Sequence, residues 1–175
     1  MHRSIRLAPA LALMALMALM GAALAVSVAF ASGGVTVELT AHRVTKDATG
    51  AEALAPAEQA KPGELLEYRA HYRNAGTGTA KGLAATLPIP RGTQYVPGSA
   101  LPGRVEASLD GKTFAPIPLM RKVKTKSGRT VMREVPASEY RALRWPLGTL
   151  PAHQEKTVAA RVRVEATPPV ANDPD

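Results

Sequence analysis

The stretch that decides the fold of this chain runs from Lys61 to Ser99 and reads KPGELLEYRAHYRNAGTGTAKGLAATLPIPRGTQYVPGS. From Leu66 to Arg73 apolar and polar residues alternate, which is typical of a β-strand with one buried face. Asn74-Ala75-Gly76 follows, and both Asn and Gly tolerate the positive φ of a tight reversal. A second alternating run spans Ala80 to Ile89, where Pro88 cannot donate to a sheet and so indicates an edge or an end. The stretch predicts consecutive strands joined by turns.

The same alternation extends over the rest of the chain. Asp110-Gly111 predicts a two-residue type I′ hairpin, and Ser127-Gly128 predicts a second hairpin. The polar, alanine-rich segment from Thr45 to Ala60 is interpreted as a loop or an edge segment. The strands expected outside the opening stretch are residues 35–42, 104–109, 113–117, 119–125, 129–135, 140–147 and 156–165, the last two as a pair.

These patterns define the fold class. About eight or nine short strands, regular turn signals and no helical period after the N-terminal leader are typical of an all-β sandwich. Most connections are too short for a parallel crossover, so the pairing is expected to be antiparallel. Aromatic residues make up 4% of the chain, so the core should consist of Val, Leu and Ala with Tyr68, Tyr72 and Trp145 as large anchors.

The N-terminal leader resembles a secretion signal. A basic N-terminus precedes an uncharged Ala/Leu/Met run from Leu7 to Phe30. The small residues of Ala29-Phe30-Ala31 predict cleavage before Ser32, with Ala23-Leu24-Ala25 as a second candidate. The alternative is an uncleaved anchor, because the run just reaches the length that spans a membrane. We therefore expect a signal peptide at residues 1–31.

The remaining residues bound the class of protein. Residues 32–166 form the expected sandwich domain, and the Pro-rich residues 167–175 are expected to be a disordered tail. The chain has no cysteine, so an exported form must be stabilised by packing and hydrogen bonds without disulfides. Its net charge of +8 favours encounters with acidic partners without selecting among them. The expected location is the periplasm, the cell surface or the medium.

Several turn and strand motifs together resemble one known family. They are Lys61-Pro62-Gly63-Glu64 before a Tyr-centred strand, Asn74-Ala75-Gly76, Leu87-Pro88, Pro90-Arg91-Gly92-Thr93, Tyr95-Val96-Pro97-Gly98-Ser99 and Trp145-Pro146-Leu147-Gly148-Thr149-Leu150-Pro151. They resemble the bacterial and archaeal conserved repeat domain of unknown function, a module of secreted and surface proteins. The resemblance implies an immunoglobulin-like antiparallel β-sandwich and specifies no activity. The segment from Leu101 to Glu139 exceeds a minimal module, so a specific function is expected there.

One part of that segment is strongly basic. Residues 119–135 contain six cations in a run with no acid before Glu134, and its lysines recur at every second position. On an extended strand these lysines would form one cationic row that could bind a polyanion. The alternative is an exposed hairpin whose lysines prevent edge-to-edge aggregation. The candidate polyanion-binding residues are Arg121, Lys122, Lys124, Lys126, Arg129 and Arg133.

The sequence offers little for catalysis or metal binding. It has no Gly-x-Ser-x-Gly elbow and no phosphate-binding glycine loop, and Asp is scarce. The scattered Glu64, Glu67, Glu106 and Glu139 are interpreted as solvated or capping charges. A copper site could use histidine and methionine, but the spacing of these residues is not that of a ligand set. No catalytic residue, metal ligand or cofactor is predicted; the residues weighed for copper are His42, His71, His153, Met120 and Met132.

These observations favour a non-catalytic exported protein of the cell envelope that acts as a structural or protein-interaction module. The alternative is binding of an anionic envelope polymer or a membrane surface through the basic hairpin 119–135. A third hypothesis is strand addition at an exposed edge, through Thr45–Ala60 or the Pro-rich tail. No specific nucleic acid is expected as a partner, because no aromatic residue interleaves the cations. A membrane is expected only with an uncleaved leader.

Overall fold

The computed structural model describes residues 26–28, 34–57 and 59–166. Within these residues nearly all regular structure is β, and the one helical turn described is the 3₁₀ turn η2 (Ala137–Glu139). The strands are β1 (Val26–Val28), β2 (Val35–Lys46), β3 (Glu52–Pro56), β4 (Leu65–Asn74), β5 (Ala80–Pro88), β6 (Thr93–Tyr95), β7 (Glu106–Ser108), β8 (Ala115–Pro116), β9 (Met120–Lys124), β10 (Thr130–Glu134), β11 (Ala142–Leu150) and β12 (Glu155–Val164).

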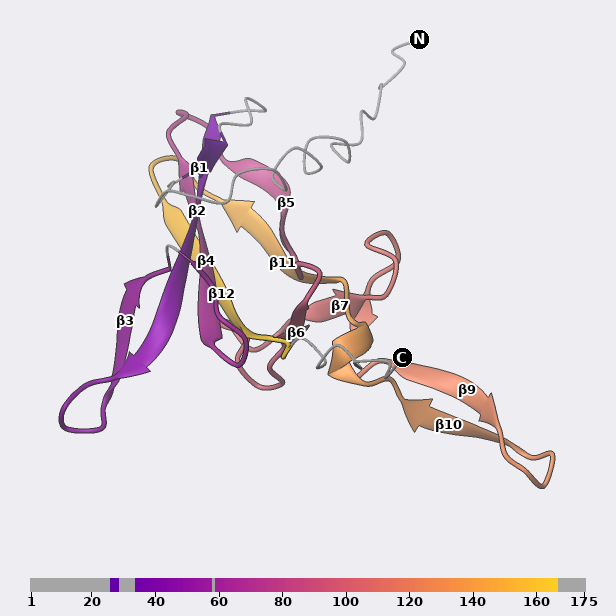
Figure 1. Ribbon diagram of the computed structural model, residues 1–175. Coiled ribbons are helices and arrows are strands. Elements are labelled where there is room, and N and C mark those ends of the chain that lie inside the picture. The colour runs from indigo at the N-terminus through magenta and orange to yellow at the C-terminus, as the bar shows by residue number, and fades with distance from the viewer. Residues whose placement is uncertain (1–25, 29–33, 58, 167–175) are drawn as a thin grey trace, which may run out of the picture.

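The strands form two packed sheets and a separate hairpin (Figure 1). The six-stranded sheet has the order β1-β2-β4-β12-β6, and its sixth strand, β3, pairs with the C-terminal part of β2. The four-stranded sheet has the order β5-β11-β7-β8. Strands β9 and β10 form a third, two-stranded sheet. Every strand pairing in the described part of the chain is antiparallel. The expected all-β antiparallel sandwich is confirmed.

The core lies between the two sheets and follows the period of two. On β4 the predicted inward face is confirmed, with Leu66, Ala70 and Tyr72 buried and Tyr68 partly buried against the core. Trp145 on β11 is 1% exposed. The sequence prediction did not include a second aromatic cluster. There Tyr95 and Tyr140 stack with ring centroids 6.2 Å apart and an interplanar angle of 18°.

Strands β11 and β12 do not pair with each other, so the predicted final pair is wrong. Strand β11 pairs with β5 and β7 in the four-stranded sheet, whereas β12 pairs with β4 and β6 in the six-stranded sheet. The chain therefore crosses from one layer to the other through residues 151–154, and the two strands lie on opposite sides of the core.

Residues 45–56 of the segment 45–60 lie in an edge hairpin, so for them the edge interpretation is right and the loop interpretation is wrong. Strand β2 continues past the expected residues 35–42 to Lys46, and β3 pairs with its last five residues. The Asp47 carboxylate stabilises the turn because its Oδ1 accepts hydrogen bonds from the backbone N–H groups of Thr49 and Ala51 at 2.8 and 3.0 Å. These bonds lower the pKa of Asp47, the bond from the Thr49 hydroxyl contributing most.

Asn74 organises the first turn of the opening stretch through its side chain. Its amide nitrogen donates to the carbonyls of Gly78 at 2.8 Å and Leu150 at 2.9 Å, and its Oδ1 accepts from Gly76 N at 3.0 Å. The positive φ expected in this reversal occurs at neither Asn74 nor Gly76. Among the described residues, positive φ occurs only at His153 and at nine other glycines. Gly34 approaches this turn so closely that a Cβ there would lie 2.9 Å from Gly76 Cα.

The pairings predicted for the edge strand and the two hairpins are observed, but one of the predicted turns is wrong. Strand β5 is an edge strand, as Pro88 indicates. Strands β7 and β8 pair as expected, but residues 109–114 connect them, so the two-residue type I′ turn is wrong. The Asp110 carboxylate closes that loop through the N–H groups of Thr113 and Lys112, and these bonds lower its pKa strongly. The hairpin around Ser127-Gly128 is confirmed.

The structure tests the predicted boundaries of the leader and the tail only in part. Strand β1 falls inside the range predicted as signal peptide and pairs with residues 37–39 of β2. Cleavage before Ser32 would remove β1 and free that edge of β2. The other residues of the predicted leader and the predicted tail 167–175 lie outside the described residues. Within the described ranges no helix has the length and apolarity needed to cross a membrane.

Candidate functional site

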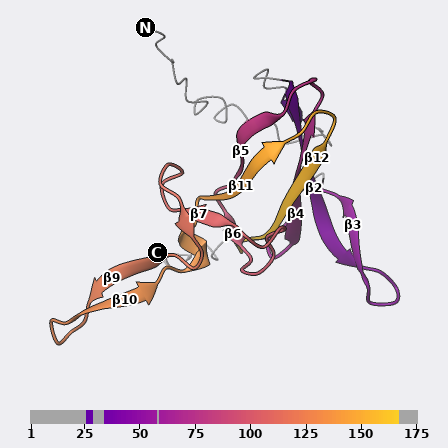
Figure 2. The same ribbon diagram turned by 180° about the vertical axis from the view of Figure 1, so that it is seen from behind.

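The basic hairpin β9–β10 projects from one end of the sandwich (Figure 1). Within the described part of the chain, β9 and β10 pair only with each other, and no residue from 120 to 134 is buried. The β2–β3 hairpin extends to the opposite side, as the reverse view in Figure 2 also shows. A two-stranded sheet alone is marginally stable in water, so the hairpin depends on its attachment to the sandwich.

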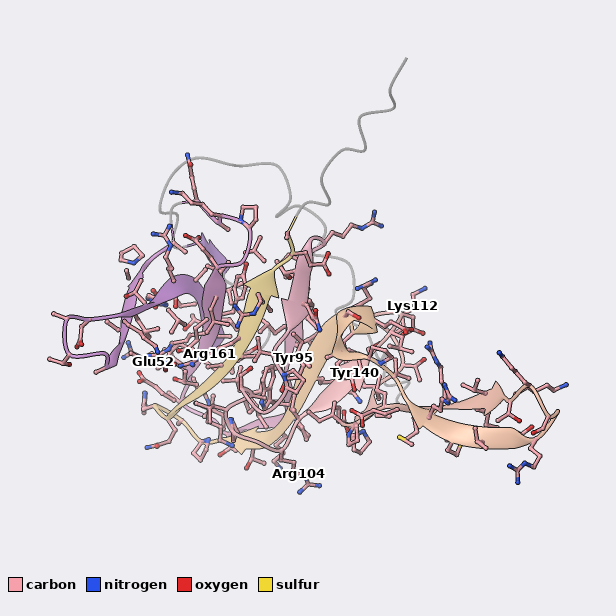
Figure 3. All side chains as sticks on the ribbon, turned by 60° about the horizontal axis from the view of Figure 1, so that its bottom comes forward. Glu52, Tyr95, Arg104, Lys112, Tyr140 and Arg161 are labelled. Atoms are coloured by element: carbon pink, nitrogen blue, oxygen red, sulfur yellow. The ribbon has the colours of Figure 1, made fainter. Side chains whose placement is uncertain are left out.

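The root of the hairpin is built into the core. Leu119 and Val135 flank the two strands, are 8% and 1% exposed, and join through Val135 N donating to Leu119 O at 2.8 Å. Leu119 N donates to the hydroxyl of Tyr140 at 3.0 Å, and the Tyr140 ring stacks on Tyr95 (Figure 3). This arrangement orients the hairpin because a buried amide and two buried apolar side chains hold its base.

An ion pair between β9 and the 3₁₀ turn η2 provides a further attachment. Arg121 donates to both carboxylate oxygens of Glu139, with Nη1–Oε2 at 2.6 Å and Nη2–Oε1 at 2.9 Å. Glu139 belongs to η2, so the pair connects β9 to the turn that leads into β11. A bidentate pair of this kind has a defined geometry. Arg121 is therefore held by the protein itself, which weakens its assignment to the polyanion-binding set.

The remaining cations lie on different parts of the hairpin. The register places Lys122 opposite Met132 and Lys124 opposite Thr130 on one face. Arg133 lies opposite Arg121 on the other face. Lys126 comes after β9, in the turn at the tip. The single row of three lysines is therefore only partly confirmed: two lysines share a strand face and the third extends beyond it.

Tyr140→Phe tests how the root holds the hairpin. Removing the hydroxyl leaves the buried Leu119 amide without its acceptor, so we expect the free energy of unfolding to fall by about 1.5 kcal/mol. Amide hydrogen exchange followed by NMR should show faster exchange at Leu119 and along β9. The control is Tyr68→Phe, because Tyr68 lies on β4 in the six-stranded sheet and not at the root of the hairpin. Equal exchange of β9 in the two variants would contradict the role of the hydroxyl.

A second polar cluster lies on the outer face of the six-stranded sheet, where Glu67 was expected to be solvated. That expectation is wrong, because the Glu67 side chain is 6% exposed and accepts from Arg69 Nε at 2.6 Å and Arg161 Nε at 3.0 Å. Arg161 also contacts both carboxylate oxygens of Glu52 on β3, at 3.0 and 2.7 Å (Figure 3). Burial would raise the pKa of Glu67, but the two arginines outweigh it and lower that pKa. The cluster attaches the β2–β3 hairpin to the sheet.

The other glutamates weighed from the sequence have different roles. Glu64 accepts a hydrogen bond from Lys61 N at 2.8 Å and lies 3.2 Å from Arg43 Nε, as a capping charge does. Glu106 pairs with Arg144 at 2.7 Å across β7 and β11. Both behave as local structural charges, in agreement with their interpretation as capping or strand-face residues.

One exposed group of side chains resembles part of a hydrolase triad. His71 Nδ1 lies 2.9 Å from Thr157 Oγ1, and His71 Nε2 lies 3.1 Å from Glu155 Oε2. Arg73 also contacts Glu155, at 3.4 Å, and the four side chains come from two directly paired positions of β4 and β12, His71 with Thr157 and Arg73 with Glu155. Cross-strand pairs of this kind stabilise a sheet face. We therefore interpret these side chains as a ladder of polar cross-strand pairs and not as a catalytic group.

The residues weighed for copper do not come together. His42 is on β2, His71 on β4 and His153 in the turn before β12, whereas Met120 and Met132 are on the hairpin. No group of three or more His, Cys, Asp or Glu side chains able to hold a metal occurs in the described ranges. Two of the surface recesses formed by the described residues have volumes of about 480 and 290 Å³. Gly76 and Lys81 line the larger recess, and neither recess is lined by the histidines.

Comparisons with protein-family models, with curated proteins and with solved structures find no match. The resemblance to the conserved repeat domain therefore stays a prediction. The geometry of the chain is the basis for assigning it a function. It defines an antiparallel β-sandwich with a rooted, solvent-exposed cationic hairpin.

Proposed function

We propose that the protein is a non-catalytic, exported module of the cell envelope whose β9–β10 hairpin makes contacts with other molecules. The observation that carries this proposal is the contrast between the two ends of the hairpin. Its base is buried and hydrogen-bonded at Leu119 and Tyr140, while residues 120–134 are exposed or half-buried. A projecting element on a rigid support is the usual arrangement of a binding loop.

The sequence supports the location in this proposal. The leader has the pattern of a secretion signal. The immunoglobulin-like resemblance is also typical of exported modules. An envelope protein is the partner that we propose first.

A second candidate function is binding to an anionic envelope polymer or an anionic membrane surface. It is favoured by five hairpin cations for which no ion pair occurs among the described residues: Lys122, Lys124, Lys126, Arg129 and Arg133. Arg121 is not counted with them because Glu139 neutralises it. Each lysine or arginine near an anionic surface contributes on the order of 1 kcal/mol at moderate salt.

Charge reversal of Lys122, Lys124 and Lys126 to Glu separates the two candidates. If an anionic surface is the target, binding to phosphatidylglycerol vesicles should fall at least about a hundredfold. The matched control reverses three exposed cations outside the hairpin, Lys81, Arg104 and Lys112, and so changes net charge equally. Vesicle binding that is unchanged by the hairpin reversal, or reduced equally by the control, would reject the polyanion function.

The protein-partner function has its own test. Residues 120–134 are replaced by a short Gly-Ser linker between Leu119 and Val135, and retention of the exported protein in washed envelope fractions is measured at low and high salt. Retention by a protein partner should persist at high salt in the unmodified chain, because screening weakens mainly exposed charge pairs. It should be lost when the hairpin is removed. Equal retention of both chains would contradict the proposed role of the hairpin.

A further inference from the structure

The hydrogen-bond pattern of the hairpin determines which backbone groups are available to a partner. Thr125 N donates to Arg129 O at 2.8 Å, and Val135 N donates to Leu119 O at 2.8 Å. Antiparallel ladders bond alternate residue pairs, so the odd-numbered residues of β9 and β10 bond within the hairpin. The even-numbered residues direct their N–H and C=O groups outward. These residues are Met120, Lys122 and Lys124 on β9, and Thr130, Met132 and Glu134 on β10.

The two outward edges are chemically different. On β9, lysines occupy two of the three outward positions, and lysine is a common means of preventing strand addition. On β10, no outward position carries a cation, and the central residue Met132 is 54% exposed. Neither strand has another pairing partner in the described part of the chain. The β10 edge is therefore open to strand addition, while the β9 edge is protected.

We propose that two copies of this chain associate by antiparallel pairing of their β10 edges, with Met132 opposite Met132 of the second copy. The paired hairpins would form a four-stranded sheet with the strand order β9-β10-β10-β9. The partner in this inference is a second copy of the chain. The inference therefore rests on the proposed function, in which the β9–β10 hairpin contacts other molecules. Two-fold pairing of this kind uses the same surface on both copies.

The charges of β10 select this register over its neighbours. With Met132 on the two-fold axis, Arg133 lies opposite Val131 and Glu134 lies opposite Thr130, so no like charges are directly opposed. Moving the two-fold axis by one residue toward Arg133, which shifts the register by two residues, places Arg133 opposite Arg133 of the second copy. A shift in the other direction places Arg133 opposite Arg129. Like charges directly opposed across strands are destabilising, so the strand is complementary to itself in the Met132-centred register.

Projection of the hairpin allows the two copies to approach. The strands β9 and β10 extend away from both packed sheets, so a second hairpin can lie along the β10 edge (Figure 1). Antiparallel pairing places the two sandwiches at opposite ends of the new sheet. The outward lysines of β9 then remain on the outer edges, where they limit further addition.

Single cysteines in this cysteine-free chain test the proposal directly. Met132→Cys places two thiols at directly opposed, hydrogen-bonded positions, where the Cα atoms are about 5.5 Å apart and a disulfide can form. The matched control is Met120→Cys, which is similarly exposed on the same face but lies on the β9 edge. Under mild oxidation Met132→Cys should form a covalent dimer at least tenfold faster than Met120→Cys. Equal rates, or no dimer from Met132→Cys, would overturn the proposal.

Proline substitutions provide a second measurement that does not depend on oxidation. Met132→Pro removes an outward N–H and leaves the bonds within the hairpin, because proline is tolerated at edge positions. Lys122→Pro makes the same change on the β9 edge. Sedimentation equilibrium should show concentration-dependent dimers for the unmodified chain and Lys122→Pro, and monomers for Met132→Pro. Circular dichroism verifies that both variants fold, and a monomeric unmodified chain at all concentrations would overturn the inference.

The two proposals can fail separately. If β10 pairing is absent but removal of residues 120–134 still abolishes envelope retention, only the inference about a second copy is overturned. If the dimer forms but retention does not depend on the hairpin, the proposed contact with the envelope is overturned and self-association stands.

Discussion

Arg161→Ala should lower the free energy of unfolding by about 3 kcal/mol, because it leaves the buried Glu67 carboxylate with a single partner. The Glu67 side chain is 6% exposed and has little access to water as a substitute. The substitution also removes both hydrogen bonds to Glu52, so the β2–β3 hairpin should become more mobile. Urea unfolding measures the first effect, and amide exchange along β3 measures the second.

Arg163→Ala is the matched control for this prediction. It lies two residues further along β12, is exposed, and donates only to the Gly63 carbonyl at 3.1 Å. Its loss should change stability by less than about 0.5 kcal/mol. A similar destabilisation by the two alanine substitutions would show that the buried carboxylate is not the cause.

The pH dependence of the Arg161 effect follows from the lowered pKa of Glu67. Desolvation opposes ionisation of Glu67, but the hydrogen bonds from Arg69 and Arg161 outweigh it. A carboxyl with a lowered folded-state pKa contributes stability above its unfolded-state pKa and loses it as the pH falls through the folded-state pKa. The stability difference between the unmodified chain and Arg161→Ala should therefore shrink as the pH is lowered from 7 toward 3. A constant difference would contradict the assignment.

Asn74→Ala should also destabilise the protein by about 3 kcal/mol, through loss of three hydrogen bonds at a side chain that is 0% exposed. The substitution leaves the carbonyl of Leu150 without the amide donor of Asn74. It also frees the turn at Gly76 and Gly78. Thermal and urea unfolding should agree on the loss.

The control for Asn74 lies in the same turn. Thr77→Ala removes an exposed hydroxyl for which no side-chain hydrogen bond occurs among the described residues, so its effect should be small. Asn74→Gly tests the positive-φ explanation directly. If backbone conformation were the reason for asparagine, glycine would preserve stability, whereas the side-chain explanation predicts a loss at least as large as that of alanine.

Alternation in the sequence was sufficient to predict which face of β4 is buried. Strand β4 shows this, since the faces follow directly from the period of two. The same signal does not identify the neighbour of a strand. Strands β11 and β12 are consecutive and alternate well, yet they belong to different sheets because each pairs with strands far away in the chain. Long-range pairing depends on the assembled core, which a local pattern does not contain.

The polar positions that were mispredicted share one physical reason. Glu67 is on the outer face, as its position in the alternation indicates, but Arg69, Arg161 and Glu52 from three strands cover it. Asn74 is at the turn, as expected, but its partner Leu150 belongs to β11. Burial of a polar side chain depends on residues that arrive from other elements, and single-strand periodicity does not include them.

The candidate site was predictable in outline. The hairpin, its tip and its cations follow from Ser127-Gly128 and the basic run that surrounds it. Two features required the structure: Glu139 neutralises Arg121, and Tyr140 holds the Leu119 amide. Both residues follow the hairpin in sequence, and nothing in their local pattern indicated a contact with it.

The close pairing of Leu119 with Val135 has a consequence for the evolution of the protein. The two ends of the hairpin meet at a single backbone hydrogen bond of 2.8 Å, and β9 and β10 contribute no strand to either packed sheet. Insertions and deletions are tolerated where few contacts cross a boundary and the chain ends lie close together. The length, charge and sequence of the hairpin can thus change without a change in the sandwich. Under the proposed function, changes in the hairpin would alter its contacts with other molecules without changing the sandwich.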